Sequence, residues 1–221
     1  MLYQFLLPRW TPVWALALLL GTLPLTSVAD DTATILILGD SLSAAYNMEV
    51  SQSWPSLMQE RLDQDGHAYQ IFNSSIAGDT TLGGYSRLPR LLEKYAPAIV
   101  LLELGGNDGL RGLPIEETRK NLSSMIEQSQ ASGATVILAE MRIPPNYGLT
   151  YTEKFNQIYT FLTAEYGVTL LPFVLADVAL EPGLMQADGI HPGVEAQALI
   201  LDKVWQVLAP LLTLRHNASP R

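Results

Sequence analysis

The sequence predicts an α/β domain built on a five-stranded parallel sheet with helices on both faces. The chain contains five short apolar runs, and several of them are almost uninterrupted Ile, Leu and Val, as expected for strands that are covered on both sides. Longer stretches with helical periodicity separate these runs. Regular alternation of the two kinds of segment is typical of strands joined by crossover helices, and therefore of a parallel sheet.

The predicted elements follow one another without a break. The strands are expected at 34–39 (TILILG), 69–75 (YQIFNSS), 99–105 (IVLLELG), 135–140 (TVILAE) and 169–173 (TLLPF). The helices are expected at 53–64, 82–95, 115–131, 152–166 and 193–212. The first helix has Ser51 or Ser53 as its N-cap and a proline in its first turn, where proline is favoured. Because no repeat or low-complexity linker interrupts this order, residues 30–212 are expected to form one domain.

The two ends of the chain are expected to lie outside that domain. Residues 1–29 resemble a signal peptide, with Arg9, an apolar run (WALALLLGTLPL), and the small residues Ser27 and Ala29 before the cleavage point. An uncleaved anchor is the alternative, but the apolar run is short and contains a glycine and a proline. We therefore expect a periplasmic protein without a membrane span after cleavage. The polar residues 213–221 are expected to form a flexible tail.

Composition excludes several kinds of function. A formal charge of −9 and a pI near 4.7 argue against binding to nucleic acid, which needs clustered Lys and Arg. The absence of cysteine excludes disulfides, thiolate metal sites and a cysteine nucleophile. A mechanism that needs an imidazole must use His67, His191 or His216.

Unusual residues follow several of the predicted strands, where ligands of open parallel sheets bind. Ser41 comes directly after the first strand, in GDSLS, and could be a helix cap or a nucleophile. Gly78, in AGD, could bring its backbone N–H close to a ligand or could simply form a turn. Asn107, in GGND, offers an amide after the third strand. That glycine-rich stretch lacks the dinucleotide fingerprint and the Walker spacing, which disfavours nucleotide binding.

A carboxylate and an imidazole stand three residues apart before the last helix, in ADGIHP. In one turn, Asp188 could hold one ring nitrogen of His191 and leave the other nitrogen free as a base. The alternative is that Asp188 only caps the start of the helix. His67 precedes the second strand and His216 lies in the tail, so His191 is the expected base.

The stretches GDSLS, AGD, GGND and DGIHP resemble, in this order, the four blocks of the SGNH hydrolases, the GDSL family of lipases and esterases. The longer stretches LILGDSLSAAYNM, ELGGNDGLRG, RIPPNYG, LLPF and MQADGIHP resemble the family's periplasmic enzymes with acyl-CoA thioesterase, arylesterase and lysophospholipase activity. The likeness spans residues 33–211. It implies a three-layer, flavodoxin-like fold and an enzyme that cleaves small-molecule acyl esters, thioesters or lysophospholipids of medium to long chain. A monomer is expected, because a small exported hydrolase of this size needs no partner.

The resemblance also implies roles for individual residues. Ser41 would be the nucleophile, His191 the general base and then acid, and Asp188 the residue that orients the imidazole. The N–H groups of Ser41 and Gly78 and the amide of Asn107 would form the oxyanion hole. The chemistry would need no metal and no cofactor.

A loop after the fourth strand is expected to contact the acyl chain, because a loop at this place closes over the acyl chain in related thioesterases. The residues concerned are Ile143, Pro144, Pro145, Asn146 and Tyr147. A rigid connection without ligand contact is the alternative.

The sequence leaves three alternative functions open. A metal-dependent phosphohydrolase could use Asp40, Asp79 and Asp108 with His191, although these acids are expected to be turn and hydrogen-bonding residues. A carbohydrate or peptidoglycan O-acetylesterase would use the same four blocks. A lipid-binding module on an inactive hydrolase scaffold is the non-enzymatic alternative.

Overall fold

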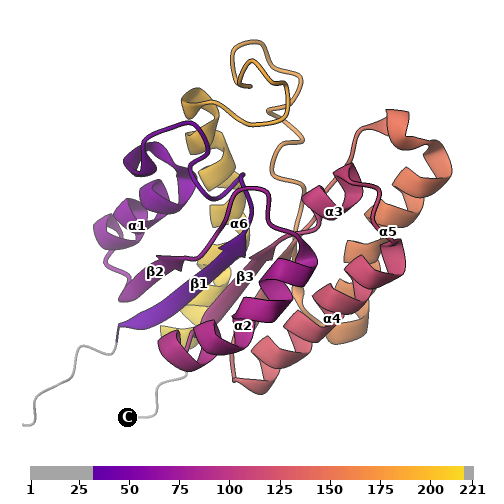
Figure 1. Ribbon diagram of the computed structural model, residues 1–221. Coiled ribbons are helices and arrows are strands. Elements are labelled where there is room, and N and C mark those ends of the chain that lie inside the picture. Colours follow the sequence, from indigo (N-terminus) through magenta and orange to yellow (C-terminus); the bar gives the residue numbers. More distant parts are fainter. Residues whose placement is uncertain (1–31, 217–221) are drawn as a thin grey trace, which may run out of the picture.

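A computed structural model describes residues 32–216 of the chain (Figure 1). The predicted signal peptide, residues 1–29, and residues 217–221 of the predicted tail lie outside the described residues. Within the described part, no helix is both long enough and apolar enough to cross a bilayer.

Five parallel strands form a single sheet in the order β2-β1-β3-β4-β5. They are β1 (Ala33–Gly39), β2 (Tyr69–Asn73), β3 (Ile99–Glu103), β4 (Thr135–Ala139) and β5 (Thr169–Leu171). This is the flavodoxin-like doubly wound order, so the predicted fold class is confirmed. The order reverses between β1 and β3, and the crevice at that switch point is where such sheets place their ligands.

Helices cover both faces of the sheet and complete a three-layer structure (Figure 1). They are α1 (Trp54–Gln64), α2 (Thr81–Tyr95), α3 (Gly106–Leu110), α4 (Ile115–Ala131), α5 (Leu149–Tyr166) and α6 (Gln197–His216). Short 3-10 turns occupy Val50–Gln52, Pro145–Tyr147 and Val194–Ala196. Helices α1 and α6 pack on one face, while α2, α4 and α5 pack on the other.

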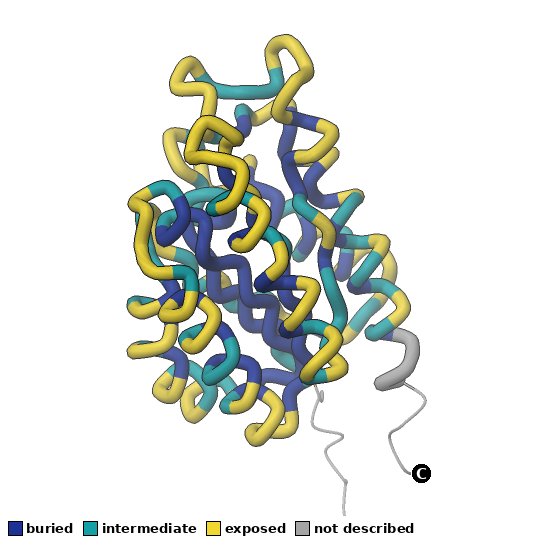
Figure 2. Tube along the Cα trace, turned by 90° about the vertical axis from the view of Figure 1, so that its right-hand side faces the viewer, coloured by how far each residue is buried: buried dark blue, intermediate teal, exposed yellow. Residues whose placement is uncertain are grey.

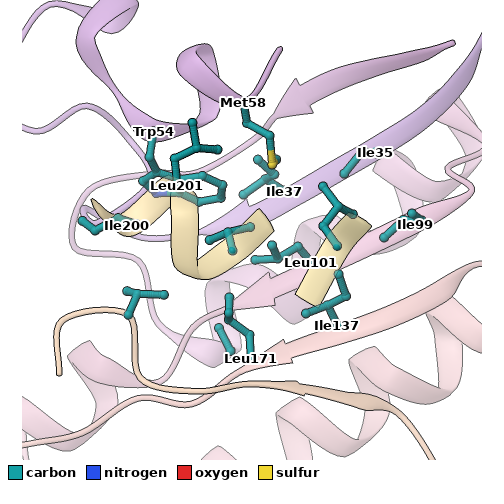
Figure 3. Packing of buried hydrophobic residues seen from close by; sticks show 14 of the residues in the cluster. Ile35, Ile37, Trp54, Met58, Ile99, Leu101, Ile137, Leu171, Ile200 and Leu201 are labelled. Atoms are coloured by element: carbon teal, nitrogen blue, oxygen red, sulfur yellow. The ribbon is translucent and has the colours of Figure 1, made fainter. Parts of the chain in front are cut away.

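The strands alternate their side chains between two apolar cores. Ile35 and Ile37 of β1 point to the core beneath α1 and α6, and Leu36 and Leu38 point to the opposite core. Figure 3 shows the first core, where Trp54, Met58, Ile200 and Leu201 of the helices meet isoleucines and leucines of the strands. Burial is greatest along the strands, and the exposed residues gather on loops and outer helix faces (Figure 2). A sheet buried on both faces explains the uninterrupted apolar runs of the sequence.

The structure corrects the predicted boundaries at the edge that carries the site. β3 ends at Glu103, not 105, and the stretch expected to be a loop contains the short helix α3. α5 begins at Leu149 instead of 152, and the last predicted helix is a 3-10 turn followed by α6, which runs to His216. Ser53 is the N-cap residue of α1, although its hydroxyl donates to the Val50 carbonyl instead of capping.

Candidate active site

Ser41 lies on a tight turn that begins where β1 ends. Residues 41–47 form turns and no helix starts there, so the alternative that Ser41 caps a helix is wrong. The turn is held from three neighbouring elements. The Trp54 indole N–H donates to the carbonyl of Leu42 at 3.1 Å, and the Asn73 amide donates to the carbonyl of Ser43 at 2.6 Å. From β3, Glu103 accepts a 2.7 Å hydrogen bond from the Ser43 hydroxyl.

Two buried carboxyl groups lie beneath this turn. Asp40 and Glu103 are each only 2% exposed. Burial raises the pKa of Glu103 well above its usual value, and the charge of Asp40 raises it further. Burial also raises the pKa of Asp40, to about 6, against hydrogen bonds from Leu42, Glu103 and Asn107 and the nearby charge of His191 that lower it. Of the two groups, Asp40 therefore ionises more readily than Glu103.

Asn107 projects from the first turn of α3, beside the end of β1. Its Nδ2 donates to Asp40 Oδ2 at 3.0 Å, which uses one of its two amide hydrogens. The chain enters α3 through Gly105, at φ +113°, and a Cβ there would lie 2.2 Å from the Tyr159 hydroxyl. That hydroxyl donates to the carbonyl of Leu104 at 3.0 Å, so a buried tyrosine of α5 holds the backbone just before α3 in place.

Asp188 and His191 occupy one turn in the long connection between β5 and α6. Asp188 Oδ1 accepts the backbone N–H groups of Ile190 and His191 at 2.9 and 3.0 Å, and its Oδ2 lies 2.7 Å from His191 Nδ1. These hydrogen bonds, first from the His191 backbone, next from its ring, then from Ile190, lower the pKa of Asp188 to about 2. Asp188 thus holds the ring and also caps its own turn, so the alternative that it only caps the start of the helix is wrong.

The two turns meet at a hydrogen bond of 2.9 Å between His191 Nε2 and Ser41 Oγ. Because Asp188 is ionised at neutral pH and can only accept, Nδ1 of the imidazole carries the proton. In the neutral ring Nε2 is then an acceptor, and the Ser41 hydroxyl donates to it. A serine, an imidazole and a carboxylate in this order can transfer the hydroxyl proton to the ring as the oxygen attacks a carbonyl.

Two contacts that the sequence did not reveal join these turns. The Tyr46 ring stacks on the His191 ring, with centroids 4.1 Å apart. Gln186 Nε2 donates to the carbonyls of Tyr46 and Pro192, both at 3.0 Å, and so links the serine turn to the histidine turn. No sequence signal pointed to Tyr46 or Gln186. Glu103 was also missed, although a charge that ends an otherwise apolar strand is a signal that could have found it.

Gly78 lies in the β2–α2 loop with φ +76°, a conformation that glycine adopts without strain. Arg111, which follows α3, donates to the Gly78 carbonyl at 2.8 Å and ties this loop to the helix that carries Asn107. Among residues 32–216, neither the Gly78 N–H nor the Ser41 N–H donates a hydrogen bond. Both donors are available to a developing oxyanion.

The loop after β4 is held against α3 and α5. Ile143 is buried, and a Cβ on Gly109 would lie 2.5 Å from its Cγ2. Pro145–Tyr147 form a 3-10 turn on the surface, where the Tyr147 hydroxyl donates to the carbonyl of Leu110 at 2.9 Å. Pro144 and Asn146 are exposed. The loop therefore adjoins the helix of Asn107, and its contact with an acyl chain stays a prediction.

The remaining acids at the strand ends serve the loops, as predicted. Asp108 accepts the backbone N–H and the hydroxyl of Thr81 at 2.9 and 2.5 Å, and Asp79 pairs with Arg87 at 2.8 Å. Over the described part of the chain, histidine, aspartate and glutamate side chains do not gather in threes as a metal site would require. His67 precedes β2, at the opposite end of the strands, near Trp205. The His216 side chain lies outside the described residues.

Comparison with known proteins identifies the family of the chain. Residues 37–199 match the model of the GDSL-like lipase/acylhydrolase family. The chain belongs to this family. Esterase TesA of Pseudomonas aeruginosa is 46% identical over 197 residues, which cover 88% of this GDSL-like chain and 98% of that protein.

Further relatives of this GDSL-like protein carry related names. Thioesterase 1/protease 1/lysophospholipase L1 of Escherichia coli K12 is 44% identical over 188 residues, which cover 85% of this chain and 89% of that protein. Among solved structures, the psychrotrophic esterase EstA from a Pseudoalteromonas species, inhibited by monoethylphosphonate, has a TM-score of 0.79 and 41% identity. The match covers 81% of this chain and 98% of that one.

Proposed function

We propose that this protein is a serine hydrolase that cleaves acyl esters and thioesters through an acyl-enzyme on Ser41. The observation that carries the proposal is the continuous contact from Asp188 through His191 to the Ser41 hydroxyl, at 2.7 and 2.9 Å. A serine hydroxyl is a weak nucleophile until a base takes its proton, and this contact supplies an oriented base.

In the first half of the reaction, Ser41 attacks the acyl carbon while His191 Nε2 takes the hydroxyl proton. Asp188 keeps the ring in the tautomer that can accept this proton and stabilises the imidazolium that forms. Donors at the Ser41 and Gly78 N–H groups and at the free amide hydrogen of Asn107 receive the negative charge of the tetrahedral intermediate. His191 then returns the proton to the leaving alcohol or thiol.

In the second half, water attacks the acyl-enzyme with His191 again as the base, and Ser41 is regenerated. No step uses a metal or a cofactor. The names of the relatives, esterase, thioesterase and lysophospholipase, support an acyl substrate with an oxygen or a sulfur leaving group. The exposed rim of the loop at residues 143–147, with Tyr147 beside α3, is proposed to contact the acyl chain.

We further propose that the protein works in the periplasm as a monomer. The support for export is the N-terminal sequence alone: an apolar run followed by small residues at the expected cleavage point after Ala29. N-terminal sequencing of the protein recovered from the periplasmic fraction tests this. A mature chain that begins at Asp30 is expected, whereas an intact N-terminus in the membrane fraction would contradict it.

Covalent labelling by a fluorophosphonate tests the nucleophile. The wild-type protein is expected to take one label, on the peptide that contains Ser41, and Ser41→Ala none. Ser86→Ala is a matched control, because Ser86 lies on the outer surface of α2 and donates only to the Leu82 carbonyl. An unlabelled wild-type protein would favour the lipid-binding module.

A series of nitrophenyl esters from acetyl to palmitoyl tests the substrate class. We expect kcat/KM to rise beyond acetyl and to reach its maximum at a medium or long chain. Activity restricted to the acetyl ester would favour an O-acetylesterase instead.

A further inference from the structure

Glu103 is a buried acid that the proposed mechanism does not use. It ends β3 directly beside Gly39, its partner in the sheet register. Its carboxyl group passes over the place where Gly39 has no side chain, since a Cβ there would lie 2.4 Å from Oε2. The glycine before Asp40 therefore makes room for Glu103.

The carboxyl group of Glu103 reaches one residue before Ser41 and one after it. Its Oε2 accepts the Asp40 N–H at 3.3 Å and the Ser43 hydroxyl at 2.7 Å. Its other oxygen, Oε1, is buried and receives no hydrogen bond within residues 32–216. Burying an ionised carboxylate with one oxygen that accepts no hydrogen bond would cost roughly several kcal/mol. A protonated carboxyl group avoids this cost because it can donate its own hydrogen.

Asp40 connects Glu103 to the residues of the site. Its carboxylate accepts the Leu42 N–H at 3.1 Å on Oδ1 and the Asn107 amide at 3.0 Å on Oδ2. The result is a chain of contacts from β3 to the turn of Ser41 and to the amide of Asn107.

We propose that Glu103 is a positioning residue that holds Asp40 and, through it, the oxyanion-hole amide of Asn107. This inference rests on the proposed function. Glu103 lies behind Asp40 and does not touch the reacting atoms. Its effect should therefore appear in kcat, through a misaligned Asn107, and not in the binding of substrate.

A double-mutant cycle tests the coupling. Glu103→Leu removes both hydrogen-bonding oxygens and is expected to lower kcat about 10- to 100-fold with little change in KM. In an Asn107→Ala background the same change is expected to cost less than about threefold, because the amide that it misaligns is already gone. Equal losses in the two backgrounds would show that Glu103 does not act through Asn107 and would overturn the inference.

Two further variants keep the test decisive. Glu103→Gln keeps an oxygen that can accept from the Ser43 hydroxyl and the Asp40 N–H, so it should restore most of the kcat lost in the leucine variant. A glutamine as damaging as leucine would show that these hydrogen bonds do not hold the site, and it would overturn the inference. If Glu103→Leu does not fold, Glu103→Asp can replace it in the cycle, since the shorter side chain withdraws its carboxyl group from Ser43 and the Asp40 backbone.

Glu140→Gln is the matched control for these variants. Glu140 follows β4 at the same edge of the sheet, but it accepts from Phe173 and Arg142 instead of the serine turn. It should leave kcat within about twofold of the wild type, as expected for independent sites. Failure of the proposed function would look different: the wild-type protein itself would neither react with the fluorophosphonate nor hydrolyse esters, and both proposals would be overturned.

Discussion

The two halves of the site meet at the Ser41–His191 hydrogen bond but lie at very different depths. On the nucleophile side, Asp40 and Glu103 are 2% exposed and lie at the carboxyl ends of the neighbouring strands β1 and β3. On the imidazole side, the side chains of His191 and Asp188 are 16% and 36% exposed. The nucleophile side is held by buried carboxyl groups, and the imidazole side by a turn that folds on itself.

Because of this difference in burial, changes on the two sides should affect activity and stability differently. Removing one hydrogen-bond partner from a buried polar network leaves another buried group unsatisfied, which destabilises the folded state. A change on the nucleophile side should therefore affect both activity and the free energy of unfolding. The histidine turn is solvated and is formed mainly by its own backbone, with Asp188 as its cap. Changes there should affect activity while the protein stays almost as stable.

The largest expected effect is on the exposed side. His191→Ala should lower kcat by about 10⁴-fold or more, because the base of both half-reactions is lost. The free energy of unfolding should change by less than about 1 kcal/mol, since the ring is near the surface. Steady-state kinetics and urea unfolding measure the two quantities. His67→Ala, at the opposite end of the strands, is the matched control, and a similar loss of kcat there would contradict the assignment.

Asn107→Ala should affect both quantities. Loss of one oxyanion donor is expected to lower kcat by about 10²- to 10³-fold. The variant should also unfold about 1–3 kcal/mol more easily, because the buried Asp40 carboxylate loses a hydrogen-bond donor. Asn156→Ala on α5 is a control for the removal of a half-buried amide. An Asn107 variant that loses activity but no stability would show that the nucleophile side does not contribute more to stability than the imidazole side.

The sequence predicted the parts of the site that depend on chain position. Ser41 and Asn107 follow strands that are neighbours in the sheet, and parallel strands bring such residues to one edge. Asp188 and His191 are close in the chain, so a single turn is enough to join them. The fold class followed from the alternation of apolar runs and helical stretches for the same reason, because both patterns are local.

The supporting contacts could not be predicted because they join distant segments. Gln186 reaches the carbonyl of Tyr46 across 140 positions, and Glu103 reaches the Ser43 hydroxyl across 60. The short helix α3 was missed for a different reason. It contains two glycines and begins after another glycine, so its helical propensity is poor, and tertiary contacts such as that of Tyr159 determine its place.

The pH dependence of stability should depend on the buried pair. Because burial raises the pKa of both Asp40 and Glu103, the folded state binds more protons than the unfolded state above about pH 4. Stability is then fullest below that pH and is lost as the pH rises through the raised pKa values. Glu103→Gln removes one ionisable group and its repulsion of Asp40. Between pH 5 and 8 it should therefore lose less stability than the wild-type protein.

Urea unfolding of both proteins at several pH values measures this difference. The other ionisable groups near the pair are His191, which faces Asp40, and Tyr159, on which Asp108 and Glu140 also act. Burial raises the pKa of Tyr159 well above its usual value, so it stays neutral throughout. These groups are common to both proteins, and their contributions cancel in the comparison. Identical pH profiles would mean that folding does not raise the pKa of Glu103.

The smallest expected effect concerns the link between the two sides. Gln186→Ala removes the hydrogen bonds that join the serine turn to the histidine turn, but it leaves the Tyr46 stacking and the Asp188 turn in place. We expect kcat to fall by about threefold to tenfold, equivalent to about 0.7–1.4 kcal/mol, with KM unchanged. Gln70→Ala, a surface glutamine on β2, is the control for loss of an exposed amide. A loss as large as that of His191→Ala would mean that the imidazole side depends on long-range contacts as strongly as the nucleophile side does, because its own turn would then be insufficient to hold the ring.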